Sequence, residues 1–224
     1  MTATIHQQTA RLGLAISSPV RLRALNLLSQ RPWRVSELAE ELGESMAATS
    51  AHLKVLRAAC MVSVEKSGRD VWCRVASGEV IQLLSAAHRA AEALLPELRE
   101  AARIAEEDPF LLPQVDFETL AAEVALGEAT LIDLRPAREF QSGHLPGAQS
   151  WPYDTLSGTK LEALKDRPGV IGYCRGPWCL QARLGIEALN QRGIPAKRLR
   201  AGVVEWQAAG LPLIREPHGA PGAR

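Results

Sequence analysis

The pattern of the chain changes near its middle, and this change restricts the possible folds more than any other feature. Up to about residue 107, apolar residues recur mostly at helical spacing. After Asp108-Pro109 and Pro113, short apolar runs alternate with helical segments, which predicts an α/β domain with a parallel sheet. We therefore expect two domains, a mainly α domain over residues 1–108 and an α/β domain over 117–224, with a linker over 109–116.

Composition narrows the class of protein. Hydrophobic residues make up 46% and charged residues 23%, a globular balance. No run approaches the roughly 18 apolar residues that a membrane span needs. Residues 1–10 are polar and lack an apolar signal core, so we expect a cytoplasmic protein with no membrane partner. In that compartment the four cysteines are expected to be reduced. The formal net charge is only +1, so nucleic-acid binding would require charge concentrated locally.

The first domain is predicted to contain short helices followed by a hairpin. Helix start and stop signals predict helices over residues 19–28, 35–42 and 46–59. Ser18, Ser36 and Ser45 are the expected N-caps, and Gly43 the expected C-cap of the second helix. Strands over 61–66 and 70–75 flank Ser67-Gly68-Arg69, a hairpin signal. A long helix over about 78–107 follows, and Pro96 predicts a kink or break in it.

Two short helices joined through Gly43 and followed by a hairpin are the parts of a winged helix-turn-helix. The run from Ser45 to Val62, with SAHLKVLRAA at 50–59, resembles the recognition helix of the ArsR family of bacterial repressors. The resemblance covers about residues 10–105. It implies that double-stranded operator DNA is the partner and that the helix over 78–107 forms a homodimer. A winged helix used only for protein contact is the alternative.

Positive charge is concentrated in the part of the chain that carries this resemblance. Up to Val75 there are ten Lys and Arg against six Asp and Glu, whereas residues 76–108 have three against seven. Thr49, Leu53 and Leu56 share one helical face and are expected to be buried. The opposite face has only short side chains, so thymine methyl groups, the wing and DNA shape are expected to supply specificity. The expected DNA contacts are Ser45, Ala47, Ala48, Ser50, Ala51, His52, Lys54, Arg57, Lys66, Arg69 and Arg74.

The first domain lacks the features of a metal sensor. The Cys-x-Cys pair that the family often carries before the turn is absent, and the long helix offers only His88. We therefore expect no metal and no other cofactor. Cys60, where the family usually has Gly, and Cys73 in the second wing strand are predicted to be half-buried. They are predicted to lie too far apart for a disulfide.

Three ordered motifs in the second half resemble the rhodanese family, over about residues 117–214. The first is LIDLRP at 131–136 with EFQSGHLPGA at 139–148. The second is YCRGPWC at 173–179, between an apolar strand and a helix, where rhodaneses keep their active loop. The third is GVVEW at 202–206 with AAGLP at 208–212. The resemblance implies that Cys174 accepts sulfane sulfur as a persulfide.

A strand–loop–helix transition directs backbone N–H groups at one point, which lowers the pKa of a cysteine there and stabilises a persulfide anion. This predicts a nucleophilic Cys174. Cys179 stands where many rhodaneses have an arginine for thiosulfate, which disfavours thiosulfate turnover. Cys179 is expected either to resolve the persulfide by forming a disulfide or only to pack in the first helical turn. The residues expected to bind substrate or orient the loop are Arg175, Gly176, Pro177, Trp178, Asp133 and Arg135.

A DNA-binding domain joined to a persulfide carrier predicts a sensor. The leading hypothesis is a dimeric repressor whose operator affinity falls when a reactive sulfur species modifies Cys174. The signal would pass by sulfur transfer to Cys60 or Cys73, or mechanically through residues 108–113. A second hypothesis is a sulfurtransferase whose DNA-binding half controls its own expression. A third, a metalloid responder, is disfavoured, because the loop is one residue shorter than the related phosphatase cradle and lacks its closing arginine.

Overall fold

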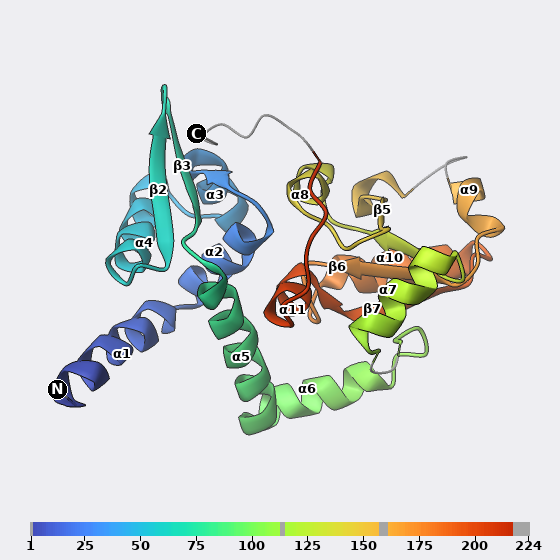
Figure 1. Cartoon of the computed structure of the whole chain (residues 1–224), viewed down its shortest axis with the longest axis horizontal. Helices are drawn as coiled ribbons and strands as arrows, with labels where there is room; N and C mark the ends of the chain where they lie inside the picture. Colours follow the sequence, from blue (N-terminus) through green and yellow to red (C-terminus); the bar gives the residue numbers. More distant parts are fainter. Residues whose placement is uncertain (1, 113–114, 157–160, 217–224) are drawn as a thin grey trace. The chain divides into compact units, whose positions relative to one another are not determined.

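The computed structural model describes residues 2–112, 115–156 and 161–216 (Figure 1). By packing, the chain divides into two compact units, between Leu84 and Ser85. The first is mainly helical with a three-stranded sheet, and the second is an α/β unit with a four-stranded sheet, as the sequence predicts. The division falls inside the helix α5 (Gly78–Leu94), upstream of the linker expected over 109–116, of which 113–114 lie outside the described residues.

The first unit has the order helix, helix, short strand, helix, helix and hairpin. Its elements are α1 (Thr2–Ile16), α2 (Pro19–Gln30), β1 (Trp33–Arg34), α3 (Val35–Leu42), α4 (Met46–Ala58), β2 (Val62–Ser67) and β3 (Asp70–Val75). Two expected caps are present, since the Ser18 hydroxyl accepts a bond from Arg21 N and the Ser45 hydroxyl accepts one from Ala48 N. Gly43 ends α3 in the left-handed conformation, with φ 70°. The helix α1 was not predicted.

The prediction that Ser36 is the N-cap of α3 is wrong. Arg34 occupies the cap position of α3 and makes no side-chain cap hydrogen bond. The reason lies in the sheet: β1 pairs with β3 through Trp33 opposite Cys73 and Arg34 opposite Trp72. This pairing holds the backbone extended up to Arg34, so the helix begins at Val35. A long-range strand pair has overridden a local capping signal.

The helix α4 and the hairpin form the predicted winged helix-turn-helix. The strand order is β1-β3-β2, antiparallel throughout, and Val64 pairs with Cys73. Thr49, Leu53 and Leu56 are buried, as predicted. Leu53 and Leu56 pack in one core with side chains from α2, α3 and β2. This packing leaves the opposite face of α4 at the surface.

The two cysteines of this unit differ from the expected half-buried pair. Cys73 is buried and its thiol donates to the carbonyl of Trp33, 3.3 Å away. Burial raises the pKa of the Cys73 thiol to about 12, so it stays protonated and unreactive at neutral pH. Cys60 is exposed and has φ 57°, the left-handed region that favours glycine. Both are free thiols.

Replacing Cys60 with glycine is expected to stabilise the first unit by about 0.5–1 kcal/mol, because glycine adopts a positive φ without the clash of a β-carbon. The gain is partly offset by the greater freedom of glycine in the unfolded chain. Denaturant unfolding of the full chain measures it. Cys60→Ala keeps the β-carbon and is the matched control, so a stabilisation of equal size in both variants would contradict this explanation.

The long helix expected over 78–107 is interrupted, as Pro96 predicts. The helix α5 ends at Leu94 and α6 (Pro96–Glu106) begins after Leu95, whose backbone is extended. No helix within the described ranges is both long enough and apolar enough to cross a membrane.

The second unit is built on a parallel sheet of order β5-β4-β6-β7. The strands are β4 (Thr130–Asp133), β5 (Gln149–Ser150), β6 (Val170–Cys174) and β7 (Ala196–Gly202). The helices are α7 (Phe117–Leu126), α8 (Ala137–Ser142), α9 (Glu162–Lys165), α10 (Leu180–Gln191) and α11 (Val203–Ala208), with a short 3-10 turn over Tyr153–Thr155. The two apolar runs form β4 and β6, side by side as predicted for buried parallel strands.

Two cores cover opposite faces of this sheet. Successive side chains of a strand point to opposite faces. Val170 and Cys174 therefore pack with α9 and α10, while Ile171 and Tyr173 pack with α7 and α11. The carboxyl end of β6 thus presents Cys174 to α10 and Tyr173 to the opposite layer.

Candidate functional site

The candidate sulfur site is the loop between β6 and α10. Strand β6 ends at Cys174, and Cys179 is the N-cap residue of α10. Between them lie Arg175, Gly176, Pro177 and Trp178. The strand–loop–helix placement expected from the sequence is therefore present. The backbone of β7 supports the loop from behind, because Cys174 pairs with Gly202.

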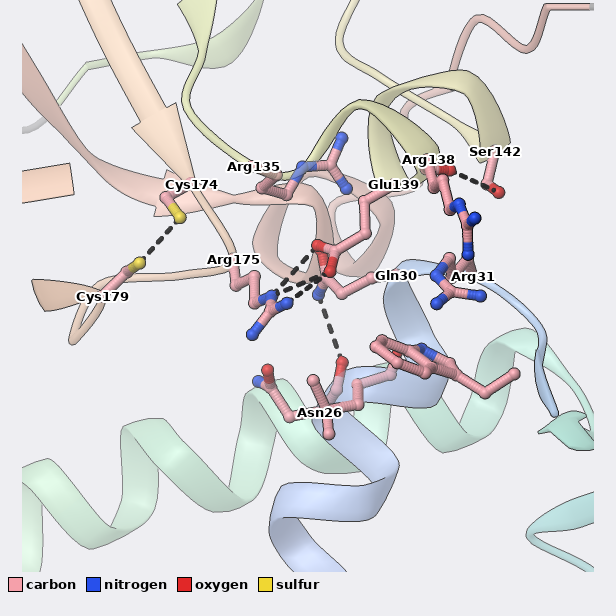
Figure 2. Close-up of polar contacts among 12 residues, drawn as sticks. Asn26, Gln30, Arg31, Arg135, Arg138, Glu139, Ser142, Cys174, Arg175 and Cys179 are labelled. Atoms are coloured by element: carbon pink, nitrogen blue, oxygen red, sulfur yellow. Dashed lines mark hydrogen bonds and ion pairs between the residues drawn. The ribbon is translucent and has the colours of Figure 1, made fainter. Parts of the chain in front are cut away.

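The loop brings its two cysteines together. Their sulfur atoms lie 2.7 Å apart and share a hydrogen bond (Figure 2). Both are free thiols. Cys174 is only 1% exposed, whereas Cys179 is half-buried. A disulfide has an S–S bond of about 2.05 Å, so the pair needs only a small movement to form one.

The electrostatics of the pair differ from the prediction. The sequence predicts a lowered pKa for Cys174, but the hydrogen bond with Cys179 and burial raise the pKa of the Cys174 thiol. The same hydrogen bond lowers the pKa of Cys179 to about 6, and backbone N–H groups of Ala182, Arg175 and Gln181 lower it further. Cys179 makes no ordinary side-chain cap bond, but it stands at the positive end of α10. The two sulfur atoms therefore share one hydrogen bond, which favours a single negative charge on the pair.

The Arg175 side chain is directed away from the two sulfur atoms. Its guanidinium donates hydrogen bonds to the carboxylate of Glu139, with Nη2 2.5 Å and Nε 3.1 Å from Oε1 (Figure 2). Glu139 lies in α8 and is only 1% exposed. This bidentate ion pair, buried on the Glu139 side, fixes the loop to the segment after β4. Arg175 therefore positions the loop.

Asp133 and Arg135 form a second buried ion pair, in which both side chains are 0% exposed. Arg135 Nη2 lies 2.6 Å from Asp133 Oδ2 and also donates to the carbonyl of Gly143. The Tyr173 hydroxyl donates to Asp133 and accepts a bond from Leu145 N. Asp133 and Arg135 therefore lie inside the protein and hold the residue that precedes Cys174.

Two arginines of β7 connect the loop with acidic residues of α5, of α6 and of the segment after α6. Arg198 donates to the carbonyl of Pro177 at 3.2 Å and lies 3.4 Å from Asp108 Oδ2. Arg200 pairs with Glu92 of α5 at 2.6 Å and with Glu106 of α6 at 3.3 Å. Its guanidinium carbon also lies 5.7 Å from the centre of the Trp178 ring. Arg198 and Arg200 thus connect the loop residues Pro177 and Trp178 with Asp108, Glu92 and Glu106.

Four residues near the loop were not predicted as site residues. Glu139 and Glu205 belong to the quoted rhodanese motifs, so position in a motif was the available signal for them. The Glu205 carboxylate accepts a hydrogen bond from Gly202 N. A β-carbon built on Gly176 would lie 3.6 Å from Oε2 of Glu205, so the carboxylate is next to the loop. Burial raises its pKa. Tyr173 likewise begins the quoted motif at 173–179, whereas Arg198 carries no local signal, because its partners are distant in the sequence.

The candidate DNA-binding surface lies on α4 and the hairpin. Most of the expected contact residues are exposed: Ser45, Ala47, Ser50, Ala51, Lys54, Arg57, Lys66, Arg69 and Arg74. Ala48 and His52 are partly buried. Arg74 already bonds Ser63 and lies 3.8 Å from Glu65 across the hairpin, so it must leave that pair to reach a phosphate. Met46, 51% exposed at the start of α4, was not predicted.

Comparison with known proteins supports the resemblances found in both halves of the chain. The family model "Bacterial regulatory protein, arsR family" matches residues 18–64, and the model "Rhodanese-like domain" matches residues 116–209. The HTH-type transcriptional regulator Rv0324 of Mycobacterium tuberculosis is 32% identical over 221 residues, which cover 98% of this chain and 94% of that protein.

Two further relatives each match one half. A protein of Allochromatium vinosum named "Sulfurtransferase" is 33% identical over 107 residues, 46% of this chain and 96% of its own length. The "Transcriptional repressor SmtB homolog" of Synechocystis is 32% identical over 77 residues, 34% of this chain and 58% of its own length. The chain belongs to the arsR family of bacterial transcriptional regulators and carries a rhodanese-like domain after its DNA-binding domain.

Proposed function

We propose that this regulator is a homodimeric repressor that releases its operator when a sulfane-sulfur compound oxidises the pair Cys174 and Cys179. One observation carries the proposal: the two sulfur atoms lie 2.7 Å apart in the rhodanese loop. A thiol pair this close is converted by one sulfane sulfur into a disulfide with release of sulfide. The chemistry needs no metal and no cofactor.

The DNA-binding half supports the output of this sensor. Lys54, Arg57, Lys66 and Arg69 are exposed on α4 and the hairpin, where they can neutralise phosphates. The homodimer is proposed through α5 and α6, where Leu94, Leu95, Leu98 and Ile104 are exposed. Repression agrees with the name of the Synechocystis relative.

The contacts favour a mechanical route for the signal over sulfur transfer to the first unit. Cys73 is buried with a raised pKa and is a poor acceptor of sulfur. The loop instead contacts β7, because Arg198 holds the Pro177 carbonyl and Asp108, and Arg200 holds α5 and α6. When the disulfide forms, Pro177 and Trp178 move with it and disturb these ion pairs. Sulfane sulfur then lowers operator affinity because the oxidised and reduced forms of the protein differ in their helix contacts.

The test is operator affinity, measured by fluorescence anisotropy at one fixed salt concentration. The DNA is a fragment from upstream of the protein's own gene, and the protein is tested before and after sodium tetrasulfide. Wild type is expected to lose about 5–150-fold in affinity, the usual range of coupling between two sites. Cys174→Ser is expected to keep its affinity, and Cys60→Ser is the matched control that should still respond. Release of DNA by treated Cys174→Ser would contradict the proposal.

A sulfurtransferase is the second candidate, favoured by the match of the α/β domain to the Allochromatium protein. In that case the DNA-binding half only controls expression. Steady-state transfer of sulfur to cyanide or a thiol, unchanged by bound DNA, together with unchanged operator affinity after treatment, would favour it over the sensor.

A further inference from the structure

The recognition helix α4 changes in chemical character along its length. None of residues 46–51, which form its first half, has a charged or amide side chain. The exposed residues of this half are Met46, Ala47, Ser50 and Ala51. The second half instead exposes Lys54 and Arg57, and Lys54 lies about 12 Å further along the helix axis than Met46. The uncharged and the charged surfaces of α4 are therefore separated along the axis.

Met46 is the largest exposed side chain on the uncharged half. It is 51% exposed and begins α4 directly after Ser45. The Ser45 hydroxyl accepts a hydrogen bond from Ala48 N at 3.1 Å, so the backbone beside Met46 is held at a fixed helix start. The Met46 side chain is unbranched and carries a thioether, which lets it adapt to an irregular apolar surface. A fixed backbone with an adaptable side chain suits contact with a small apolar group.

The major groove of duplex DNA fits both surfaces of α4 at once. Lys54 and Arg57 are exposed cations that can neutralise phosphates. In a helix-turn-helix, the N-terminal residues of the recognition helix contact base edges in the groove. Bidentate pairing with guanine or adenine uses Arg, Lys, Asn or Gln, which residues 46–51 lack. The apolar group that base edges present in the major groove is the C5-methyl group of thymine.

We propose that Met46 is a specificity-determining residue of this regulator and that its side chain contacts the C5-methyl group of a thymine in each operator half-site. The short side chains of Ala47 and Ala51 let the helix approach the base edges closely. The Ser50 hydroxyl both donates and accepts hydrogen bonds, so it selects weakly among bases. The inference rests on the operator binding of the proposed function, and it is independent of the sulfur response.

The size of the expected effect follows from burial of the methyl group. Burying one methyl group changes an affinity by about fourfold. A homodimer contacts two half-sites, so loss of both methyl groups is expected to weaken binding by about 15-fold. Phosphate contacts carry no sequence information, so Lys54 and Arg57 contribute equally whether or not the methyl groups are present. Specificity and phosphate binding are therefore separable by experiment.

The test removes these methyl groups and leaves every hydrogen-bonding group of the DNA in place. The operator is first selected from random duplexes with the untreated full chain, and symmetric pairs of its thymines are then replaced by deoxyuridine, one pair at a time. Fluorescence anisotropy at one fixed salt concentration measures each affinity. Wild type is expected to lose about 15-fold at one pair. A selected operator with no thymine in its half-sites would overturn the inference, as would a full set of replacements that leaves the affinity unchanged.

Variants of the full chain test the role of Met46 itself. Met46→Ala is expected to bind the thymine and deoxyuridine operators within about twofold of one another, because the apolar contact is lost. Met46→Leu is expected to restore most of the difference, because leucine is apolar and of similar size. Val55→Ala is the matched control and is expected to respond as wild type. Val55 is 37% exposed on the same helix, nine residues from Met46 and therefore on the opposite side of the helix.

Circular dichroism verifies that each variant is folded. A loss of about 15-fold retained in Met46→Ala would show that the methyl groups act through DNA shape, which would overturn the inference. If the methyl dependence is present but sodium tetrasulfide leaves operator affinity unchanged, only the proposed function fails.

Discussion

Asp133→Ala is expected to destabilise the α/β unit by about 3–5 kcal/mol, the usual cost of leaving a buried charge without its partner. Asp133 receives bonds from Arg135 and from the Tyr173 hydroxyl, and its side chain is 0% exposed. Without the carboxylate, the Arg135 guanidinium keeps its bond to the Gly143 carbonyl and the weaker attraction of Glu139 but loses the carboxylate that it bonds directly. The cost is large because a guanidinium cannot escape by releasing its proton.

Denaturant unfolding of the full chain measures this loss, and hydrogen exchange read by mass spectrometry assigns it to β4 and β6. Glu100→Ala is the matched control, because it breaks an ion pair with Arg103 that is exposed on both sides. An exposed pair contributes at most about 1 kcal/mol. If Asp133→Ala costs no more than Glu100→Ala, the buried network does not hold the end of β6 as we infer.

The parts of the fold that local signals determine could be predicted. Caps at Ser18 and Ser45, the break before Pro96 and the apolar runs of β4 and β6 are each encoded within a few residues. Strand β7 could not, because its sequence AKRLRAG has no apolar run. Its arginines are accommodated by distant acids, Arg200 by Glu92 and Glu106, and Arg198 by Asp108. Tertiary partners thus decide strand formation there.

In the candidate site, too, some features follow from local sequence and others depend on residues distant in the sequence. The spacing of Cys174 and Cys179 across a strand–loop–helix boundary is local, and it predicted that the two thiols would share one loop. Which thiol is charged depends on the positions of their sulfur atoms and on the N–H groups of α10, which spacing does not specify. The role of Arg175 likewise depends on Glu139, a residue of another element. Its positive charge alone suggested substrate binding, whereas the ion pair with Glu139 indicates that Arg175 holds the loop in position.

Gly202→Ala is expected to slow formation of the Cys174–Cys179 disulfide by about 10–100-fold, the scale of effect that a displacement near 1 Å has on a reaction between held groups. A β-carbon on Gly202 would lie 2.7 Å from both the carbonyl carbon of Arg175 and the nitrogen of Gly176, and closer still to the Cys174 carbonyl oxygen. All three are backbone atoms, so no side chain can rotate away. The end of β6 must move from β7, and Cys174 moves with it.

Quenched-flow treatment with sodium tetrasulfide, followed by mass analysis of the disulfide, measures the rate for Gly202→Ala against wild type. Overpacking of this kind is also expected to cost about 1–3 kcal/mol, so the reaction is run where circular dichroism shows the variant folded. Gly78→Ala is the matched control, because a β-carbon there meets nothing within 4 Å. A wild-type rate in folded Gly202→Ala would show that close support by β7 does not set the geometry of the two sulfur atoms.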